Sequence, residues 1–183
     1  MIEVPPLPEH IKLEDLEVAR KEASRGGDWY TRAKAWLHIA GITNDPKDLG
    51  KAWNAAHLLH KKDRLKRVEI LVELYSIDVD KKYLADARAA LVCKMGRGKK
   101  ACALALIAKA SRLMEDMKMA RKAASDVNDE YYRAKAWFII YEAERDPTDL
   151  KQAFDAQKMI KRYKLKARAR ITEFAVKVLV PVK

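Results

Sequence analysis

The stretch Arg32-Ala33-Lys34-Ala35-Trp36 decides the fold, because the same five residues return at 133–137, 101 positions later. Further matches occur at the same offset without a gap: Glu14-Asp15 with Glu115-Asp116, Ala19-Arg20-Lys21 with Ala120-Arg121-Lys122, Asp45-Pro46 with Asp146-Pro147, and Asp48-Leu49 with Asp149-Leu150. Matches at one constant offset indicate an internal duplication, and self-similarity of this kind is typical of repeat proteins. The chain is therefore built from repeated units.

A shorter repeat lies inside the duplicated block. Leu-x-x-Ala pairs, with Met replacing Leu once, recur every 33 to 35 residues: Leu16/Ala19, Leu49/Ala52, Leu84/Ala87, Met117/Ala120 and Leu150/Ala153. A small or β-branched residue follows each pair 14 to 16 positions later: Ala33, Val68, Ala101, Ala134 and Ala167. Apolar residues throughout keep the three- and four-residue spacing of a helix and do not alternate as in a strand. This pattern predicts five repeats, each a pair of helices.

A single helical hairpin of this size cannot bury its own apolar face, so stacking successive hairpins is the stable arrangement. We therefore predict an all-α fold, a solenoid of five stacked hairpins with about ten helices, forming one domain over residues 13–183. Residues 1–12 hold three of the six prolines, which disfavour a helix interior and predict an extended N-terminal arm. Trp36 and Trp137 fall at core spacing, and we expect them to fill the space between hairpins.

The second copy of the block contains only two repeats, so the last helix and tail have no following hairpin to cover them. The apolar residues concerned are Ile171, Phe174, Ala175, Val178, Leu179 and Val180. Solenoids need a polar outer cap, which leaves two alternatives. Either the tail folds back over its own array, or the C-terminal helix and tail form a symmetric homodimer contact.

The second helices resemble those of the tetratricopeptide-like superfamily. In that family a small residue is followed by a large apolar or aromatic one, then by another small one, and by a proline at the end of the unit. The matching residues are Ala33, Leu37, Ala40 and Pro46 in the first repeat and Ala134, Phe138 and Pro147 in the fourth, where Tyr141 replaces the second small residue. The resemblance implies a scaffold that captures a peptide or another protein in an inner groove formed by the first helices.

The groove candidates are the residues that follow the small alanine of each first helix: Arg20, Trp53, Arg88, Arg121 and Phe154. Three arginines and two aromatic residues favour an acidic, partly apolar partner segment. We therefore expect protein–protein interaction with an acidic partner.

The net charge of +12 is concentrated around three turns inside the predicted hairpins, which would share one edge of the array. This basic edge comprises Lys61, Lys62, Arg64, Lys66 and Arg67, then Lys94, Arg97, Lys99 and Lys100, and finally Lys161, Arg162, Lys164 and Lys166. Four of them, Lys66, Lys99, Lys100 and Lys166, fall in the predicted first turns of second helices, where the helix dipole disfavours cations. Such an edge is either a solvated surface or, as the alternative function, a nucleic-acid-binding site.

The remaining chemistry-bearing residues predict neither an enzyme nor a cofactor. His57 and His60 have the spacing of metal ligands, but no third ligand accompanies them as a zinc site requires. No phosphate-binding glycine loop or nucleophile motif is present. Cys93 and Cys102 are either two buried thiols or a disulfide across the turn between them.

Composition adds two expectations about the setting of the protein. Glycine and proline are sparse, at six each, and Asn and Gln are few, which is typical of thermophilic proteins. No apolar run reaches the length of a membrane span, and the N-terminal residues lack the features of a signal peptide. We therefore expect a cytoplasmic protein with no membrane partner.

Overall fold

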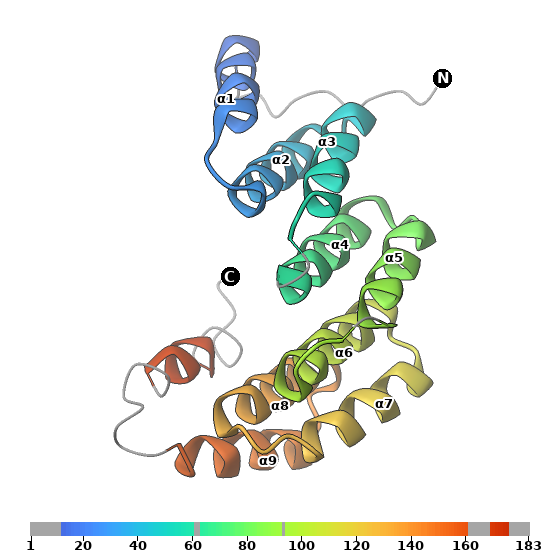
Figure 1. Ribbon diagram of the computed structural model, residues 1–183, viewed down its shortest axis with the longest axis vertical. Coiled ribbons are helices and arrows are strands. Elements are labelled where there is room, and N and C mark those ends of the chain that lie inside the picture. The colour runs from blue at the N-terminus through green and yellow to red at the C-terminus, as the bar shows by residue number, and fades with distance from the viewer. Residues whose placement is uncertain (1–11, 61–62, 93, 161–168, 176–183) are drawn as a thin grey trace. The chain divides into compact units, whose positions relative to one another are not determined.

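The computed structural model describes residues 12–60, 63–92, 94–160 and 169–175, and these residues are helical or in turns without any strand (Figure 1). The predicted all-α class is therefore confirmed. The helices are α1 (Leu13–Arg25), α2 (Trp29–Thr43), α3 (Pro46–His57), α4 (Arg64–Asp78), α5 (Lys81–Val92), α6 (Arg97–Ser111), α7 (Met114–Ser125), α8 (Glu130–Glu144) and α9 (Pro147–Lys158), and residues 169–175 are also helical. None of the described helices has the length and apolar character to cross a membrane. Most of the predicted arm, residues 1–11, lies outside the described part.

The chain divides into two compact units, unit 1 over residues 1–93 and unit 2 over residues 94–183. In unit 1, α2 packs on α1, α3 and α4, and α4 packs on α3 and α5; in unit 2, α6 packs on α7 and α8, and α8 packs on α7 and α9. The boundary falls between α5 and α6, which the repeat scheme assigns to one hairpin. The prediction of one continuous solenoid therefore stays a prediction, whereas packing of neighbouring helices is observed within each unit.

The most extensive packing joins the second helix of one repeat to the first helix of the next, as in α2 with α3 and α8 with α9. Two-residue turns connect the two helices of each such pair and bring them close together. Each turn begins with a residue in the left-handed region, whose backbone N–H closes the preceding helix: Asn44 (φ 53°), Val79 (φ 55°), Arg112 (φ 52°) and Arg145 (φ 59°). The repeat is thus visible in the backbone, even where glycine, the usual residue for this geometry, is absent.

An aspartate follows the left-handed residue in three of these turns and caps the next helix. Asp45, Asp80 and Asp146 accept backbone N–H groups of Lys47, Lys82 and Thr148 at 2.8 to 2.9 Å. A side-chain oxygen at this position satisfies a backbone donor that the helix itself leaves without an acceptor.

The predicted small residues form the centre of the core. Among the described positions, fully buried members are Ala33, Val68, Ala101 and Ala134 on the second helices and Ala52, Ala87, Ala120 and Ala153 on the first helices. Ala19 is exposed on α1. Trp36 and Trp137 are buried, as predicted from their spacing.

The described part of the last helix is covered within unit 2. Ile171 and Ala175 are buried, and the ring of Phe174 lies edge-on to that of Phe138, with centroids 6.3 Å apart. Residues 178–180 lie outside the described part, and so does the homodimer contact predicted for them. Cys102 is buried and its Sγ lies 3.5 Å from the backbone carbonyl oxygen of Tyr132, whereas Cys93 lies outside the described residues.

Candidate functional site

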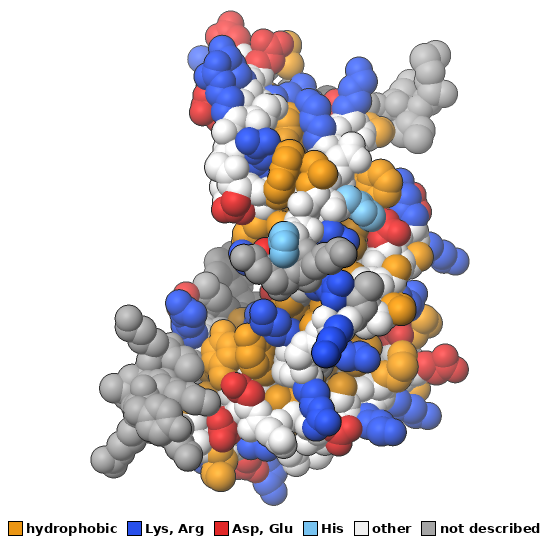
Figure 2. Space-filling view, in the orientation of Figure 1, with side chains coloured by type: hydrophobic (Ala, Val, Ile, Leu, Met, Phe, Trp, Pro, Cys, Tyr) orange, Lys and Arg blue, Asp and Glu red, His pale blue; other side chains and the backbone are white. Residues whose placement is uncertain are grey.

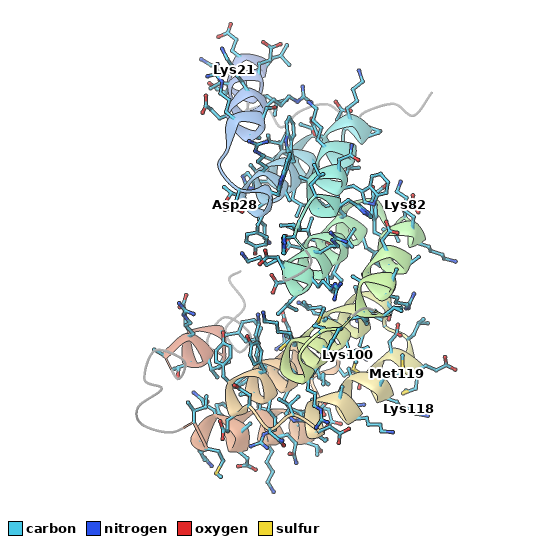
Figure 3. The ribbon with its side chains drawn as sticks, viewed as in Figure 1. Lys21, Asp28, Lys82, Lys100, Lys118 and Met119 are labelled. Atoms are coloured by element: carbon cyan, nitrogen blue, oxygen red, sulfur yellow. The ribbon has the colours of Figure 1, made fainter. Side chains whose placement is uncertain are left out.

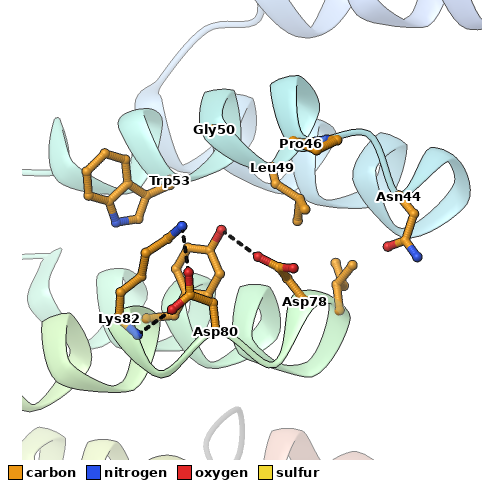
Figure 4. Close-up of a pocket in the computed structure, with 10 residues that line it drawn as sticks. Asn44, Pro46, Leu49, Gly50, Trp53, Asp78, Asp80 and Lys82 are labelled. Carbon is orange, nitrogen blue, oxygen red and sulfur yellow. Dashed lines mark hydrogen bonds and ion pairs between the residues drawn. The ribbon is translucent and has the colours of Figure 1, made fainter. Parts of the chain in front are cut away.

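Unit 1 contains a groove of about 820 Å³ between α3 and α5, bordered by the C-terminal end of α4 (Figure 4). The groove is lined by Asn44, Pro46, Leu49, Gly50, Trp53, Ile77, Asp78, Asp80, Lys82 and Tyr83. Its two long walls come from first helices of successive repeats, where the sequence predicts a partner-binding groove. Of the five predicted groove residues, Trp53 lines it.

The α3 wall is one face of a helix. Pro46, Leu49, Gly50 and Trp53 are spaced as i, i+3, i+4 and i+7, positions that share one side of a helix. Leu49 is buried and Trp53 is half-buried, so the wall is apolar with an aromatic end.

A carboxylate on α5 fixes the orientation of Trp53. The indole Nε1–H of Trp53 donates to Asp86 Oδ2 at 2.8 Å, and His57 Nε2 lies 3.2 Å from the same oxygen. The rings of Trp53 and His57 meet edge to face, with centroids 4.7 Å apart. The three side chains join α3 to α5 at one end of the groove.

The α5 wall carries charge. Asp80 accepts the backbone N–H of Lys82 at 2.9 Å, and the Lys82 ammonium lies 2.8 Å from Asp80 Oδ2 and 4.8 Å from the centre of the Tyr83 ring. The hydrogen bond from Lys82 lowers the pKa of Asp80, and the same bond raises the pKa of Lys82. Burial raises the pKa of Tyr83, whose hydroxyl donates to Asp78 at 3.4 Å. In Figure 4, Lys82 extends from α5 toward Trp53.

Two lining residues depart from the repeat. The fourth residue before the small alanine is a buried aspartate on α3, α7 and α9, at Asp48, Asp116 and Asp149, but on α5 it is Tyr83. The second residue before the same alanine is Gly50 on α3, whereas the other first helices carry Glu17, Ala85, Lys118 and Lys151 there. Both departures face the same groove.

Two of the three predicted groove arginines, Arg20 and Arg121, pair with carboxylates of the chain itself. In unit 1, Arg20 donates through Nε and Nη2 to Asp48 at 3.1 and 2.5 Å, and through Nη2 to Asp45 at 3.1 Å. These carboxylates raise the pKa of Arg20, with the hydrogen bond to Asp48 as the largest cause. Arg20 thereby links α1 to α3.

Unit 2 repeats this arrangement. Arg121 donates to Asp149 through Nε at 3.1 Å and through Nη2 at 2.6 Å, and Nη2 also reaches Glu144 at 2.6 Å. The pKa of Arg121 is raised, first by the hydrogen bond to Asp149. Phe154 lies edge-on to Phe138 with centroids 5.5 Å apart, and Arg88 is half-buried on α5. Arg121 and Phe154 therefore hold helices of unit 2 together, whereas Arg88 belongs to unit 1.

The basic edge is partly structural in unit 1. Arg67 donates to the backbone carbonyls of Ala56, His57 and Leu59 at 2.7 to 3.0 Å and so closes the C-terminal end of α3. Lys66 pairs with Asp63 at 3.7 Å and lies 4.8 Å from the Tyr30 ring centre. Arg64 is half-buried beside them. Lys61 and Lys62 lie outside the described residues.

In unit 2 the basic edge is exposed at the start of α6. Arg97, Lys99 and Lys100 are exposed there, and Lys94 precedes them. Figure 2 shows Lys and Arg side chains gathered over α6 and α7, and Figure 3 places Lys100 on α6 and Lys118 on α7. Lys161, Arg162, Lys164 and Lys166 lie outside the described residues.

Within the described ranges, no group of three or more His, Cys, Asp or Glu residues could hold a metal ion. His57 contacts Asp86 and Trp53 instead. No protein-family model, curated protein or solved structure matches the chain. The tetratricopeptide-like resemblance therefore stays a prediction, and the groove is interpreted from its own chemistry.

Several groove residues were missed from the sequence, namely Gly50, Asp80, Lys82, Tyr83 and Asp86. Two of them carry a signal that comparison of the repeats can find. Gly50 is a glycine inside a helix where the duplicate has Lys151, and Tyr83 replaces the repeated aspartate. In the sequence alone, Asp80, Lys82 and Asp86 cannot be told apart from ordinary helix-cap or surface residues.

Proposed function

We propose that this protein is a non-enzymatic helical-repeat scaffold that binds a segment of a partner protein in the groove between α3 and α5. The groove volume of about 820 Å³ lies within the range of ligand-binding clefts, and its lining combines apolar with charged residues, as such clefts do. Its walls belong to two helices that side chains fix to each other through the Trp53 to Asp86 bond.

The observation that carries the proposal is Gly50. A glycine inside a helix lowers stability by about 0.5–1 kcal/mol relative to alanine. At Gly50 neither packing nor backbone geometry requires glycine, since an added Cβ would meet nothing within 4 Å and the residue does not have a positive φ. Residues that break a local rule without a structural reason are expected at functional sites. We infer that Gly50 leaves room for a partner's backbone.

The test is a substitution that fills the groove while strengthening the helix. Gly50→Gln introduces a neutral side chain of high helix propensity, so the free energy of unfolding should rise by about 0.5–1 kcal/mol. The matched control is Asn54→Gln, at an exposed position of α3 outside the groove lining. We expect wild type and Asn54→Gln, but not Gly50→Gln, to retain a stoichiometric protein from nuclease-treated lysate of the source cells. Equal retention by all three proteins would contradict the proposal.

The acidic partner expected from the sequence has less support than the groove itself. Arg20 and Arg121, two of the three arginines behind that expectation, pair with buried aspartates of the chain. The charged residues that line the groove are Asp78, Asp80 and Lys82. The proposal therefore keeps the protein partner and does not require the partner to be acidic.

Nucleic-acid binding on unit 2 is a second candidate function. Arg97, Lys99 and Lys100 are exposed within the first turn of α6, where the helix dipole disfavours cations, so their position has no evident structural benefit. Cations that contact phosphates release counterions, so the affinity should fall steeply with salt. Charge reversal of Lys99 and Lys100 together should abolish retention of RNA, and unchanged retention would eliminate this candidate.

A further inference from the structure

Resting on the proposed function, we propose that the groove recognises a lysine or arginine within an apolar partner segment, and that Lys82 occupies this cation's place in the free protein. Binding would displace the Lys82 ammonium from Asp80 and from the Tyr83 ring. The partner segment is therefore basic and apolar, opposite in charge to the segment that the sequence predicts.

Charge around the groove favours a cationic ligand. Asp78 and Asp80 line the groove, and Asp86 lies at its Trp53 end, whereas Lys82 is the one cation among the described lining residues. Asp78 is exposed and Asp80 and Asp86 are half-buried, so their carboxylates remain reachable from solvent. A ligand carboxylate would meet like charges here, which costs affinity.

Lys82 shows how a cation is held. Its ammonium combines an ion pair with Asp80 at 2.8 Å with a position 4.8 Å from the Tyr83 ring centre. An ammonium or guanidinium near an aromatic face and beside a carboxylate is bound by both the ring quadrupole and the opposite charge. A partner's side chain could use the same two groups.

The ion pair between Lys82 and Asp80 is weak enough for a partner's cation to replace Lys82. The side chains of Lys82 and Asp80 are 53% and 40% exposed, and ion pairs this accessible contribute little to stability. A partner that also buries apolar area against Leu49, Ile77 and Trp53 gains free energy that Lys82 alone does not provide. Displacement of Lys82 therefore costs little compared with what the segment gains.

The experiment uses two blocked pentapeptides, each with four leucines around a central residue that is lysine in one and glutamate in the other. Binding to the full chain is followed by NMR at the indole N–H of Trp53, assigned with Trp53→Phe. We expect the lysine peptide to shift this signal and the glutamate peptide to leave it in place. Lys82→Met should strengthen binding of the lysine peptide about two- to fivefold, because it removes the internal competitor.

Lys81→Met is the matched control, since it removes the same charge from the neighbouring exposed residue, which does not line the groove. Its affinity for the lysine peptide should change much less than that of Lys82→Met. Asp80→Asn, which retains a helix-capping side chain, should weaken binding of the lysine peptide.

Three results would overturn the inference. These are equal or tighter binding of the glutamate peptide, weaker lysine-peptide binding by Lys82→Met, and no Trp53 shift with either peptide. A glutamate peptide that binds and is blocked by Gly50→Gln would overturn the cationic chemistry alone and leave the groove a binding site. Failure of the proposed function is detected separately, by equal retention of partner protein in the Gly50→Gln experiment.

Discussion

The two copies of the duplicated block keep the same bridge between first helices. Arg20 in unit 1 and Arg121 in unit 2 each reach a buried aspartate 28 residues later, Asp48 or Asp149, with Nε at 3.1 Å from one carboxylate oxygen in both copies. The groove residue Gly50, by contrast, corresponds to Lys151 in the second copy, so the two copies differ at this position. The two copies therefore share their framework contacts and differ at the groove surface.

The surroundings of the bridge also differ between the copies. The Thr43 hydroxyl donates to Asp48 at 3.0 Å, whereas the equivalent position in unit 2 is Glu144, which accepts from Arg121 at 2.6 Å. Both arginines have a second carboxylate partner, Asp45 for Arg20 at 3.1 Å and Glu144 for Arg121 at 2.6 Å. The copies differ in the hydroxyl of Thr43, which donates to Asp48 and has no counterpart at Glu144. The same substitution should have unequal effects in the two copies.

The largest expected effect comes from removing the buried aspartates. Asp48→Ala should destabilise unit 1 by about 3 kcal/mol, because it leaves the buried Thr43 hydroxyl without its acceptor and the half-buried Arg20 with Asp45 alone. Asp149→Ala should cost unit 2 about 1–2 kcal/mol, because Glu144 still pairs with Arg121. Hydrogen exchange of the α3 and α9 amides, measured by mass spectrometry, would separate the two units.

The exposed Asp155 offers a control for the loss of one acidic residue from α9, and Asp155→Ala should leave exchange nearly unchanged. If Asp48→Ala and Asp149→Ala cost the same, the loss of the acceptor of the Thr43 hydroxyl adds nothing, and the proposed difference between the two clusters is wrong.

A smaller effect is expected at the left-handed turns. A left-handed conformation costs an L residue about 1–2 kcal/mol, and a glycine recovers this but loses about 0.5–1 kcal/mol to its greater freedom in the unfolded chain. Val79 is 63% exposed, so Val79→Gly sacrifices little burial and should stabilise unit 1 by about 0.5–1 kcal/mol. Urea unfolding of the full chain, together with hydrogen exchange of the α4 and α5 amides, would measure this stabilisation.

Arg145 is the counterpart in unit 2. Its guanidinium lies 5.4 Å from the Tyr141 ring centre, a contact worth about 0.5–1 kcal/mol at exposed sites. Arg145→Gly gives up this contact and should be nearly neutral. A stabilisation as large as that of Val79→Gly would show that the ring contact contributes nothing.

The smallest expected effect is a change in how the stability of the protein depends on pH in acid. Asp28 and Asp146 are helix caps whose pKa is lowered, first by the backbone N–H groups of Thr31 and Thr148. A depressed folded pKa gives stability that is present above the unfolded value of about 3.9 and is lost as pH falls through the folded value. Asp28→Asn keeps a capping oxygen without titrating, so its urea midpoint should fall less than that of wild type below pH 4. An unchanged pH dependence would mean that this cap does not contribute to acid sensitivity.

Most of the helices could be predicted from the sequence because helical spacing and caps are local. The apolar period, Asp45-Pro46 and Asp146-Pro147 placed the starts of α3 and α9, and the buried small alanines followed from the repeat. The close pairing of α2 with α3 could not be read in the same way. It depends on a left-handed Asn44 and on packing that the sequence period does not specify.

The site was predicted less well, for a physical reason. Trp53, which the sequence names because it follows the small alanine of a first helix, lines the groove between α3 and α5, and its role in binding a partner stays a prediction. Arg20 occupies the same repeat position, yet its partner is Asp48, and only the tertiary structure brings these residues together. The sequence did carry a trace of this pairing, since Arg20 and Asp48 both recur at the 101-residue offset.

The 28-residue separation of Arg20 from Asp48 has a consequence for how the protein is made. A ribosome adds about 5–20 residues per second, so the carboxylate is synthesised roughly 1.5 to 6 s after the arginine. During that interval α1 cannot form the bridge that fixes it to α3. Within unit 1, α1 should therefore be secured only after α3 has been translated, and within unit 2 the same order holds for α7 and α9.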